Sequence, residues 1–76
     1  MDKVSQLMEY ITQDIIAFIV EDKLIDYEKA MEMFYTSEIY DKLLDEKTGL
    51  YTQSSAYVYD LFKNECENGF LLQEEQ

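Results

Sequence analysis

With 76 residues the chain has room for one domain with a thin core, because a domain of this size buries only about 60% of the surface that its unfolded chain exposes. A single cysteine and no histidine exclude an internal disulfide and leave too few ligands for a structural zinc site. Six Lys and Arg against 17 Asp and Glu give a net charge of −11, which opposes binding to nucleic-acid phosphate and to anionic membranes.

The acidity has two interpretations. An apolar content of 47% indicates a folded chain, since disorder combines high charge with low hydrophobicity. The charge then either keeps the protein soluble or forms an acidic surface that docks on a basic partner. No signal peptide is recognised, and the longest apolar run, residues 15–20, is far shorter than the ~20 residues of a membrane span. We therefore expect a cytoplasmic protein.

The first predicted helix covers residues 3–22. Its apolar positions recur at helical spacing and share one face: Val4, Leu7, Met8, Ile11, Ile15, Phe18 and Ile19. Ile16 and Val20 fall outside this face, so the second half of the helix is apolar on more than one side. Either neighbouring helices wrap around it, or it offers a second face to a dimer.

A second helix is predicted at residues 27–35, with Asp26 as its N-cap. The spacing assigns these side chains to its core face: Tyr27, Ala30, Met31 and Phe34. Met31 and Met33 cannot share a helix face, so we expect one of them at the surface or beneath a partner.

Thr36 or Ser37 offers the cap of a third helix at residues 38–46. The side chains predicted to point inward are Ile39, Tyr40, Leu43 and Leu44. Gly49 then supplies a left-handed turn residue. Residues 50–53 are ambiguous, and a short extended segment across the core is one interpretation.

Ser54 or Ser55 caps a fourth helix at residues 56–67. Its apolar stripe comprises Tyr57, Val58, Leu61, Phe62 and, at the end, Cys66. After a stop at residues 68–69, residues 70–76 form an acidic tail whose apolar start either folds back onto the core or docks on a partner. The sequence as a whole predicts an all-α fold: one domain over residues 1–76, built as a compact bundle of three to four short helices.

No catalytic, cofactor or metal site is expected. Histidine, the commonest general base, is absent, and two glycines do not make a phosphate-binding loop. Cys66 lacks a histidine partner and lies at the end of a helix, where nothing favours its thiolate. The acidic run before Gly49 fails the calcium-loop spacing, because a loop that starts at Asp45 places Ala56 where a glutamate ligand belongs.

Three segments together carry a resemblance: residues 34–44, residues 48–51 and residues 55–60. The first contains an aromatic-Tyr-x-Ser-x-x-Tyr-x-x-Leu pattern, which precedes a glycine turn and a tyrosine-rich helix. This arrangement resembles that of short acidic bacterial helical proteins of unknown function, some of which are paired with genes for ADP-ribosyltransferase-like toxins. The resemblance implies an accessory or antitoxin-like partner protein and supplies no catalytic residues.

We therefore expect a protein-interaction module that is not an enzyme and that binds the basic surface of a protein partner. The candidate interface consists of apolar and tyrosine side chains outside the predicted core: Ile16, Val20, Met33, Tyr35, Tyr59, Phe70, Leu71 and Leu72. One alternative is a self-assembling homodimer that packs Ile16 and Val20 against their symmetry mates. Another is an acidic inhibitor that mimics DNA. Nucleic-acid binding is not expected, since residues 38–46 carry four acids and one lysine.

Overall fold

The computed structural model describes residues 2–69, with side chains as far as Glu67. Within this range the chain forms helices and turns and no strand, which confirms the predicted all-α bundle. The elements in chain order are α1 (Lys3–Lys23), α2 (Tyr27–Tyr35), α3 (Glu38–Leu44), the 3₁₀ turns η1 (Glu46–Thr48) and η2 (Leu50–Thr52), α4 (Ser55–Asn64) and the π-helical turn η3 (Glu65–Gly69).

α1 begins and ends at capping residues that flank it. The carboxylate of Asp2 accepts a hydrogen bond from the amide of Ser5 (2.8 Å), which satisfies one of the amides left unpaired at a helix start. Beyond the last turn, Leu24 adopts a left-handed conformation with φ 56°, and its amide donates to the Val20 carbonyl (2.9 Å). The helix is therefore one residue longer than predicted.

α2 and α3 meet at a corner formed by Thr36 and Ser37. Asp26 caps α2 as predicted, accepting from the amide of Lys29 (2.8 Å). At the other end the Thr36 hydroxyl donates to the Glu32 carbonyl (2.9 Å), which also accepts from the Thr36 amide (3.2 Å). Of the two candidate caps for α3, Ser37 is the one that accepts from an amide of the first turn.

α3 is shorter than predicted, since it ends at Leu44. Asp45 adopts an extended conformation, and its carboxylate accepts from the Lys47 amide (3.0 Å), which starts η1 instead. Gly49 ends that turn in the left-handed region at φ 71°, as predicted. The segment that follows is a 3₁₀ turn, η2, rather than an extended piece, and it buries Leu50.

α4 is capped by Ser54, whose hydroxyl accepts from the Tyr57 amide (3.1 Å). It is α-helical only to Asn64, and the predicted helix to residue 67 continues as the π-helical turn η3. This turn carries the Glu65 carboxylate to the start of α3. There it accepts hydrogen bonds from the amides of Glu38 (2.9 Å) and Ile39 (3.1 Å), so α3 is capped by a residue that lies 26 positions beyond Ile39 in the chain.

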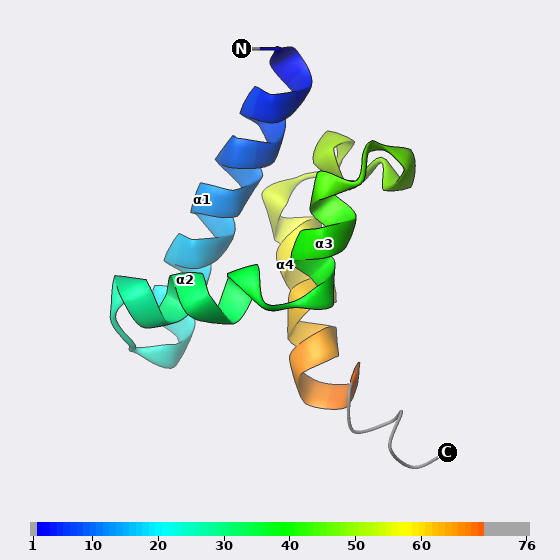
Figure 1. Cartoon of the computed structure of the whole chain (residues 1–76). Coiled ribbons are helices and arrows are strands. Elements are labelled where there is room, and N and C mark those ends of the chain that lie inside the picture. Colours follow the sequence, from blue (N-terminus) through cyan, green and yellow to red (C-terminus); the bar gives the residue numbers. More distant parts are fainter. Residues whose placement is uncertain (1, 70–76) are drawn as a thin grey trace.

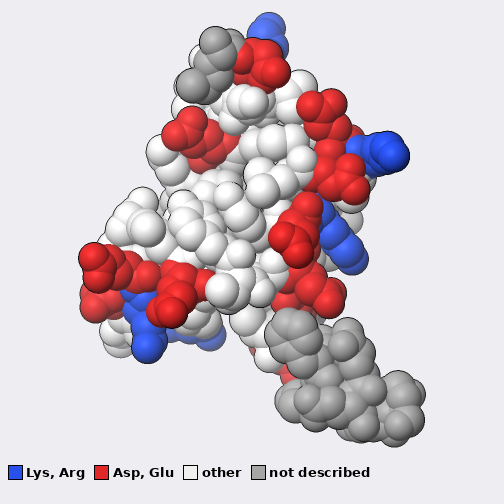
Figure 2. All heavy atoms as spheres, viewed as in Figure 1, with Lys and Arg blue, Asp and Glu red and all other residues white. Residues whose placement is uncertain are grey.

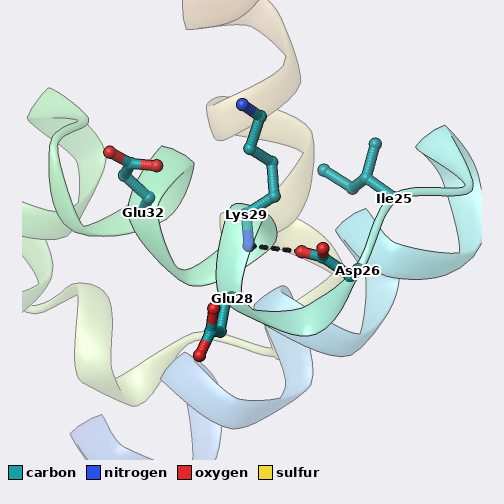
Figure 3. A pocket seen from close by; sticks show the side chains of 5 residues that line it. All are labelled: Ile25, Asp26, Glu28, Lys29 and Glu32. Atoms are coloured by element: carbon teal, nitrogen blue, oxygen red, sulfur yellow. Dashed lines mark hydrogen bonds between the residues drawn. The ribbon is translucent and has the colours of Figure 1, made fainter.

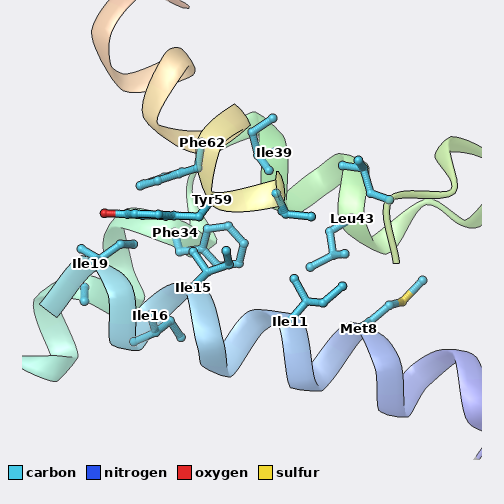
Figure 4. Packing of buried hydrophobic residues seen from close by; sticks show 13 residues of the cluster. Met8, Ile11, Ile15, Ile16, Ile19, Phe34, Ile39, Leu43, Tyr59 and Phe62 are labelled. Carbon is cyan, nitrogen blue, oxygen red and sulfur yellow. The ribbon is translucent and has the colours of Figure 1, made fainter. Parts of the chain in front are cut away.

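α1 is the common partner of the other helices. Figure 1 shows α2 crossing the C-terminal part of α1, with α3 and α4 beside them. In Figure 4 Ile15 and Ile19 of α1 point toward the part of the core that holds the rings of Phe34, Tyr59 and Phe62, and Ile11 points toward Leu43. Among these rings, Phe34 and Phe62 meet edge to face with centroids 5.6 Å apart. The core comprises Met8, Ile11, Ile15, Ile16, Ile19, Ala30, Phe34, Ile39, Leu43, Leu50, Val58, Tyr59 and Phe62.

Several side chains predicted to face the core lie at the surface instead. Leu7, Tyr27 and Leu44 are 37%, 53% and 48% exposed. Tyr27 is the first residue of α2 and Leu44 the last of α3, so both lie at helix ends. Conversely, Met31 and Met33 both pack partly against the core, and the expectation that one of them is left uncovered is wrong.

Candidate functional site

The core covers most of the apolar surplus of α1. Ile16, predicted as a contact for a dimer or partner, is only 1% exposed, so that prediction is wrong. The reason is that α2, α3 and α4 all pack on α1, which makes it a central helix wrapped by its neighbours. Val20 and Met33 are partly buried against the same core. The predicted contact segment at residues 70–72 lies outside the described residues.

Tyr57 and Tyr59 occupy the reverse of their predicted positions. Tyr59 is 8% exposed and belongs to the core, whereas Tyr57 is 49% exposed. The Tyr59 hydroxyl donates to the Asp22 carboxylate (2.6 Å), and its ring lies 5.2 Å from that of Phe18. Burial and this hydrogen bond raise the pKa of Tyr59, so it stays protonated at neutral pH. The pattern of α4 alone could not predict this, because Asp22 lies on α1.

Apolar and aromatic side chains, of which Tyr35 and Leu44 are exposed, line a groove between α1, the end of α2 and α3. Its volume is about 320 Å³, and its lining residues, named here the tyrosine groove, are Ser5, Met8, Glu9, Thr12, Tyr35, Tyr40 and Leu44. The four α1 positions are spaced i, i+3, i+4 and i+7, so they share one face over two helical turns. Tyr40 and Leu44 are one turn apart on α3. The groove thus has two helical walls.

Two tyrosines form the aromatic end of this groove. Tyr35 closes α2 and Tyr40 lies in the first turn of α3, and their ring centroids are 4.9 Å apart. Tyr40 also meets the core residue Phe34 edge to face at 5.3 Å. Burial, followed by the proximity of Tyr35 and Asp41, raises the pKa of Tyr40. Its hydroxyl is therefore a protonated donor and acceptor at neutral pH.

The corner that positions these tyrosines is fixed by hydrogen bonds from both sides. The hydroxyl of Ser37, buried at 6% exposure, donates to the Phe34 carbonyl (2.6 Å) and accepts from the Tyr40 amide (3.2 Å). Glu65 accepts from the next amides of the same helix start. A binding surface held in this way loses little conformational entropy when a ligand binds, which favours affinity.

Carboxylates border the groove. Figure 2 shows a broad area without charged side chains in the middle of this face, with acidic side chains over α2 and along the α3 edge. The exposed acids of these segments are Glu28, Glu32, Glu38, Asp41, Asp45 and Glu46. Glu9 adds a carboxylate from α1 to the lining itself. Apart from Glu9, the lining of the groove is uncharged, and exposed acids lie on the α2 and α3 segments beside it.

A second hollow lies against α2, with a volume of about 430 Å³. It is lined by Ile25, Asp26, Glu28, Lys29 and Glu32. Figure 3 shows these side chains pointing in different directions, and the carboxylate of Asp26 is already engaged as the cap of α2. Ile25 is its one apolar side chain. It therefore lacks the apolar walls with convergent polar groups that are typical of ligand sites.

A third hollow, of about 270 Å³, lies between α1 and α4. Its lining residues are Phe18, Glu21, Asp22, Ala56, Tyr59, Asp60 and Lys63. Some of its charged and polar side chains already contact other residues of the chain. The Lys63 ammonium lies 5.2 Å from the centre of the Tyr59 ring, a cation–π contact, and Asp22 accepts from the Tyr59 hydroxyl. The residues around this hollow therefore hold α4 against α1.

Neither a metal-ligand cluster nor a thiol of lowered pKa is found among the described residues. Among residues 2–69, no group of three or more Cys, Asp or Glu side chains is placed to hold a metal ion. Cys66 is exposed, yet partial burial of its thiol raises its pKa, so the thiol is protonated at neutral pH. Over the same range, no helix combines the length and hydropathy that crossing a bilayer requires.

No family model, no curated protein and no solved structure matches this chain. The resemblance to short acidic bacterial helical proteins therefore stays a prediction from the sequence pattern of residues 34–60. The structure places part of that pattern in the tyrosine groove, since Tyr35, Tyr40 and Leu44 all belong to the first of its segments.

Proposed function

We propose that this protein is a small interaction module that binds a basic protein partner, as an accessory or antitoxin-like subunit. The observation that carries the proposal is the tyrosine groove, where the exposed Tyr35 and Leu44 lie beside the half-buried Tyr40, on a chain of net charge −11. Tyrosine and methionine are enriched in protein interfaces. An acidic border steers a basic partner toward such a surface and raises the rate of association.

Two alternatives are less well supported. A homodimer built on α1 loses one of its proposed contacts, because Ile16 is buried in the core. Two copies of charge −11 also repel each other. An inhibitor that mimics DNA would act through carboxylates alone, which leaves the aromatic groove without a role.

The first test is capture of partners from the native cell extract with tagged protein, followed by mass spectrometry. Wild type is compared with Leu44→Lys and with Tyr57→Ser. Leu44 and Tyr57 are almost equally exposed, at 48% and 49%, but only Leu44 lines the groove. We expect one basic protein to be captured by wild type and by Tyr57→Ser and to be lost with Leu44→Lys. Recovery of the protein alone, sedimenting as a dimer, would instead support self-assembly.

A further inference from the structure

The tyrosine groove has the dimensions of a binding site for one helix. Its α1 wall runs from Ser5 to Thr12, about 10 Å at a rise of 1.5 Å per residue. That length equals the distance between positions i and i+7 on a second helix. The opposite wall, Tyr40 and Leu44, covers one turn of α3. A helix lying between the two walls could place three side chains, at i, i+3 or i+4, and i+7, into the groove.

The volume and lining agree with a few inserted side chains rather than a bound cofactor. At about 320 Å³ the groove is at the small end of the range for ligand pockets, ~300–1,000 Å³. The deepest side chains of its α1 wall are Met8 and Thr12, each 9% exposed. The Thr12 hydroxyl already donates to the Met8 carbonyl (2.8 Å), so at these two positions the wall presents methyl and thioether groups. Flexible thioethers adapt well to inserted apolar side chains.

The negative charge around the groove favours a positively charged ligand. Glu9 lies in the groove, while Asp41 and Asp45 are exposed on the segment that carries Tyr40 and Leu44. A second copy of this chain would bring its own net charge of −11 to this border and be repelled. A helix with Lys or Arg beside its apolar stripe would place cations next to the carboxylates of both walls. Complementary charge also fixes the register of a docked segment.

We infer, building on the proposed function, that the tyrosine groove binds a basic amphipathic helix of the partner. The apolar stripe of that helix lies between α1 and α3 against Met8, Tyr40 and Leu44. Tyr35, whose ring is tilted against that of Tyr40, covers one end of the stripe. The flanking lysines or arginines reach the acidic border.

The test uses a synthetic peptide of ~18 residues, long enough to hold helical structure when bound, with leucine along one face and lysine elsewhere. Binding to the full chain is measured by fluorescence anisotropy and by amide chemical shifts in nuclear magnetic resonance. Two control peptides share its charge: one has the same residues in scrambled order, and the other has glutamine in place of leucine. We expect tight binding of the amphipathic peptide alone, with shifts concentrated at residues that line the tyrosine groove.

Matched variants locate the site. Tyr35→Ser and Leu44→Lys alter the groove, whereas Tyr57→Ser alters an equally exposed tyrosine on α4. Each groove variant should weaken the peptide about tenfold or more, as truncation of an interface anchor does, and Tyr57→Ser should leave the affinity unchanged. Circular dichroism checks that each variant is folded, and Leu44→Lys keeps a good helix former at an exposed position.

Three outcomes would overturn the inference: equal binding of the scrambled peptide, equal weakening by Tyr57→Ser, or groove shifts that appear with protein concentration alone. The last would identify a second copy as the occupant. Failure of the inference is separable from failure of the proposed function. If a native partner binds without involving the groove, the helix-binding inference fails and the proposed interaction function stands. If the peptide binds in the groove but the cell extract yields no partner, the groove can bind a helix and the proposed function fails.

Discussion

Leu24 holds a backbone conformation that usually belongs to glycine. Its φ of 56° brings Cβ close to the backbone, which costs an L-residue roughly 1–2 kcal/mol, while Gly49 adopts φ 71° without that cost. The Leu24 side chain is 88% exposed and contributes little to the core. The turn between α1 and α2 therefore carries a leucine that lowers stability and adds apolar surface.

Replacing Leu24 with glycine should stabilise the protein. We expect Leu24→Gly to raise the free energy of unfolding by up to about 1 kcal/mol, since relief of the left-handed strain outweighs the entropy of glycine in the unfolded chain. Urea denaturation measures the difference. Leu24→Ala is the matched control, because it removes the apolar side chain but keeps Cβ and should give no gain. A stabilised alanine variant would show that exposure of leucine, not φ, is the cause.

The hydrogen bond between Tyr59 and Asp22 links α4 to α1. Tyr59→Phe should lower the free energy of unfolding by about 1–2 kcal/mol at neutral pH, because it leaves the Asp22 carboxylate without this donor. Tyr57→Phe, at an exposed position, should change it by less than ~0.5 kcal/mol. Chemical denaturation of both variants measures the two changes in the free energy of unfolding. Equal losses in the two variants would contradict the prediction.

The same pair predicts a pH dependence. The folded pKa of Tyr59 is raised above its unfolded value of about 10, so its contribution is fully present below that pH and is lost as the pH rises beyond it. The gap in stability between wild type and Tyr59→Phe should therefore narrow above about pH 10. Denaturation series at neutral and alkaline pH test this, and a constant gap would refute it.

Among the helices, the starts follow from the sequence more closely than the inward faces do. Asp26, Ser37 and Ser54 each bond an amide only three residues ahead, so their capping roles can be read locally. Which face a short helix buries depends on the length and position of the helix packed against it. The spacing of apolar residues within the short helix does not contain that information. The sequence therefore places Leu44 in the core, although it is 48% exposed, whereas Tyr40, also predicted to point inward, packs partly against the core beside the groove.

The tyrosine groove could be predicted only in part for the same reason. Tyr35 is a candidate from composition and position alone, since a tyrosine at a helix end suits an interface. Its pairing with the α1 wall joins residues far apart in the chain, and a single sequence contains no record of that contact. The burial of Ile16 likewise depends on three helices that close around α1.

Removing the remote cap of α3 should weaken that helix. Glu65→Ala deletes the acceptor for the amides of Glu38 and Ile39, and we expect a loss of about 1 kcal/mol in the free energy of unfolding. Glu67→Ala removes an exposed acid from the same turn and serves as the control. Amide hydrogen exchange should show faster exchange at the start of α3 in Glu65→Ala only. Unchanged protection there would exclude the capping role.

Over the whole molecule, the charge opposes folding. A net charge of −11 on 76 residues produces self-repulsion that salt screens, with a Debye length of about 3 Å at 1 M. We expect sodium chloride to raise the melting temperature, and a relief of ~1 kcal/mol would correspond to ~4–8 °C for a domain of this size. Calorimetry at low and high salt measures the shift. A melting temperature that falls with salt would show that attractive charge pairs dominate instead.

The dependence of every later helix on α1 has a consequence for synthesis. α1 is complete at Lys23, but α4, which closes the core over it, ends at Asn64. At 5–20 residues per second, the ribosome needs ~2–8 s to add the intervening residues. For those seconds the isoleucines that will face α4 have no partner within the nascent chain. Of the described helices, α1 is made first, and the side of it that faces α4 is covered last.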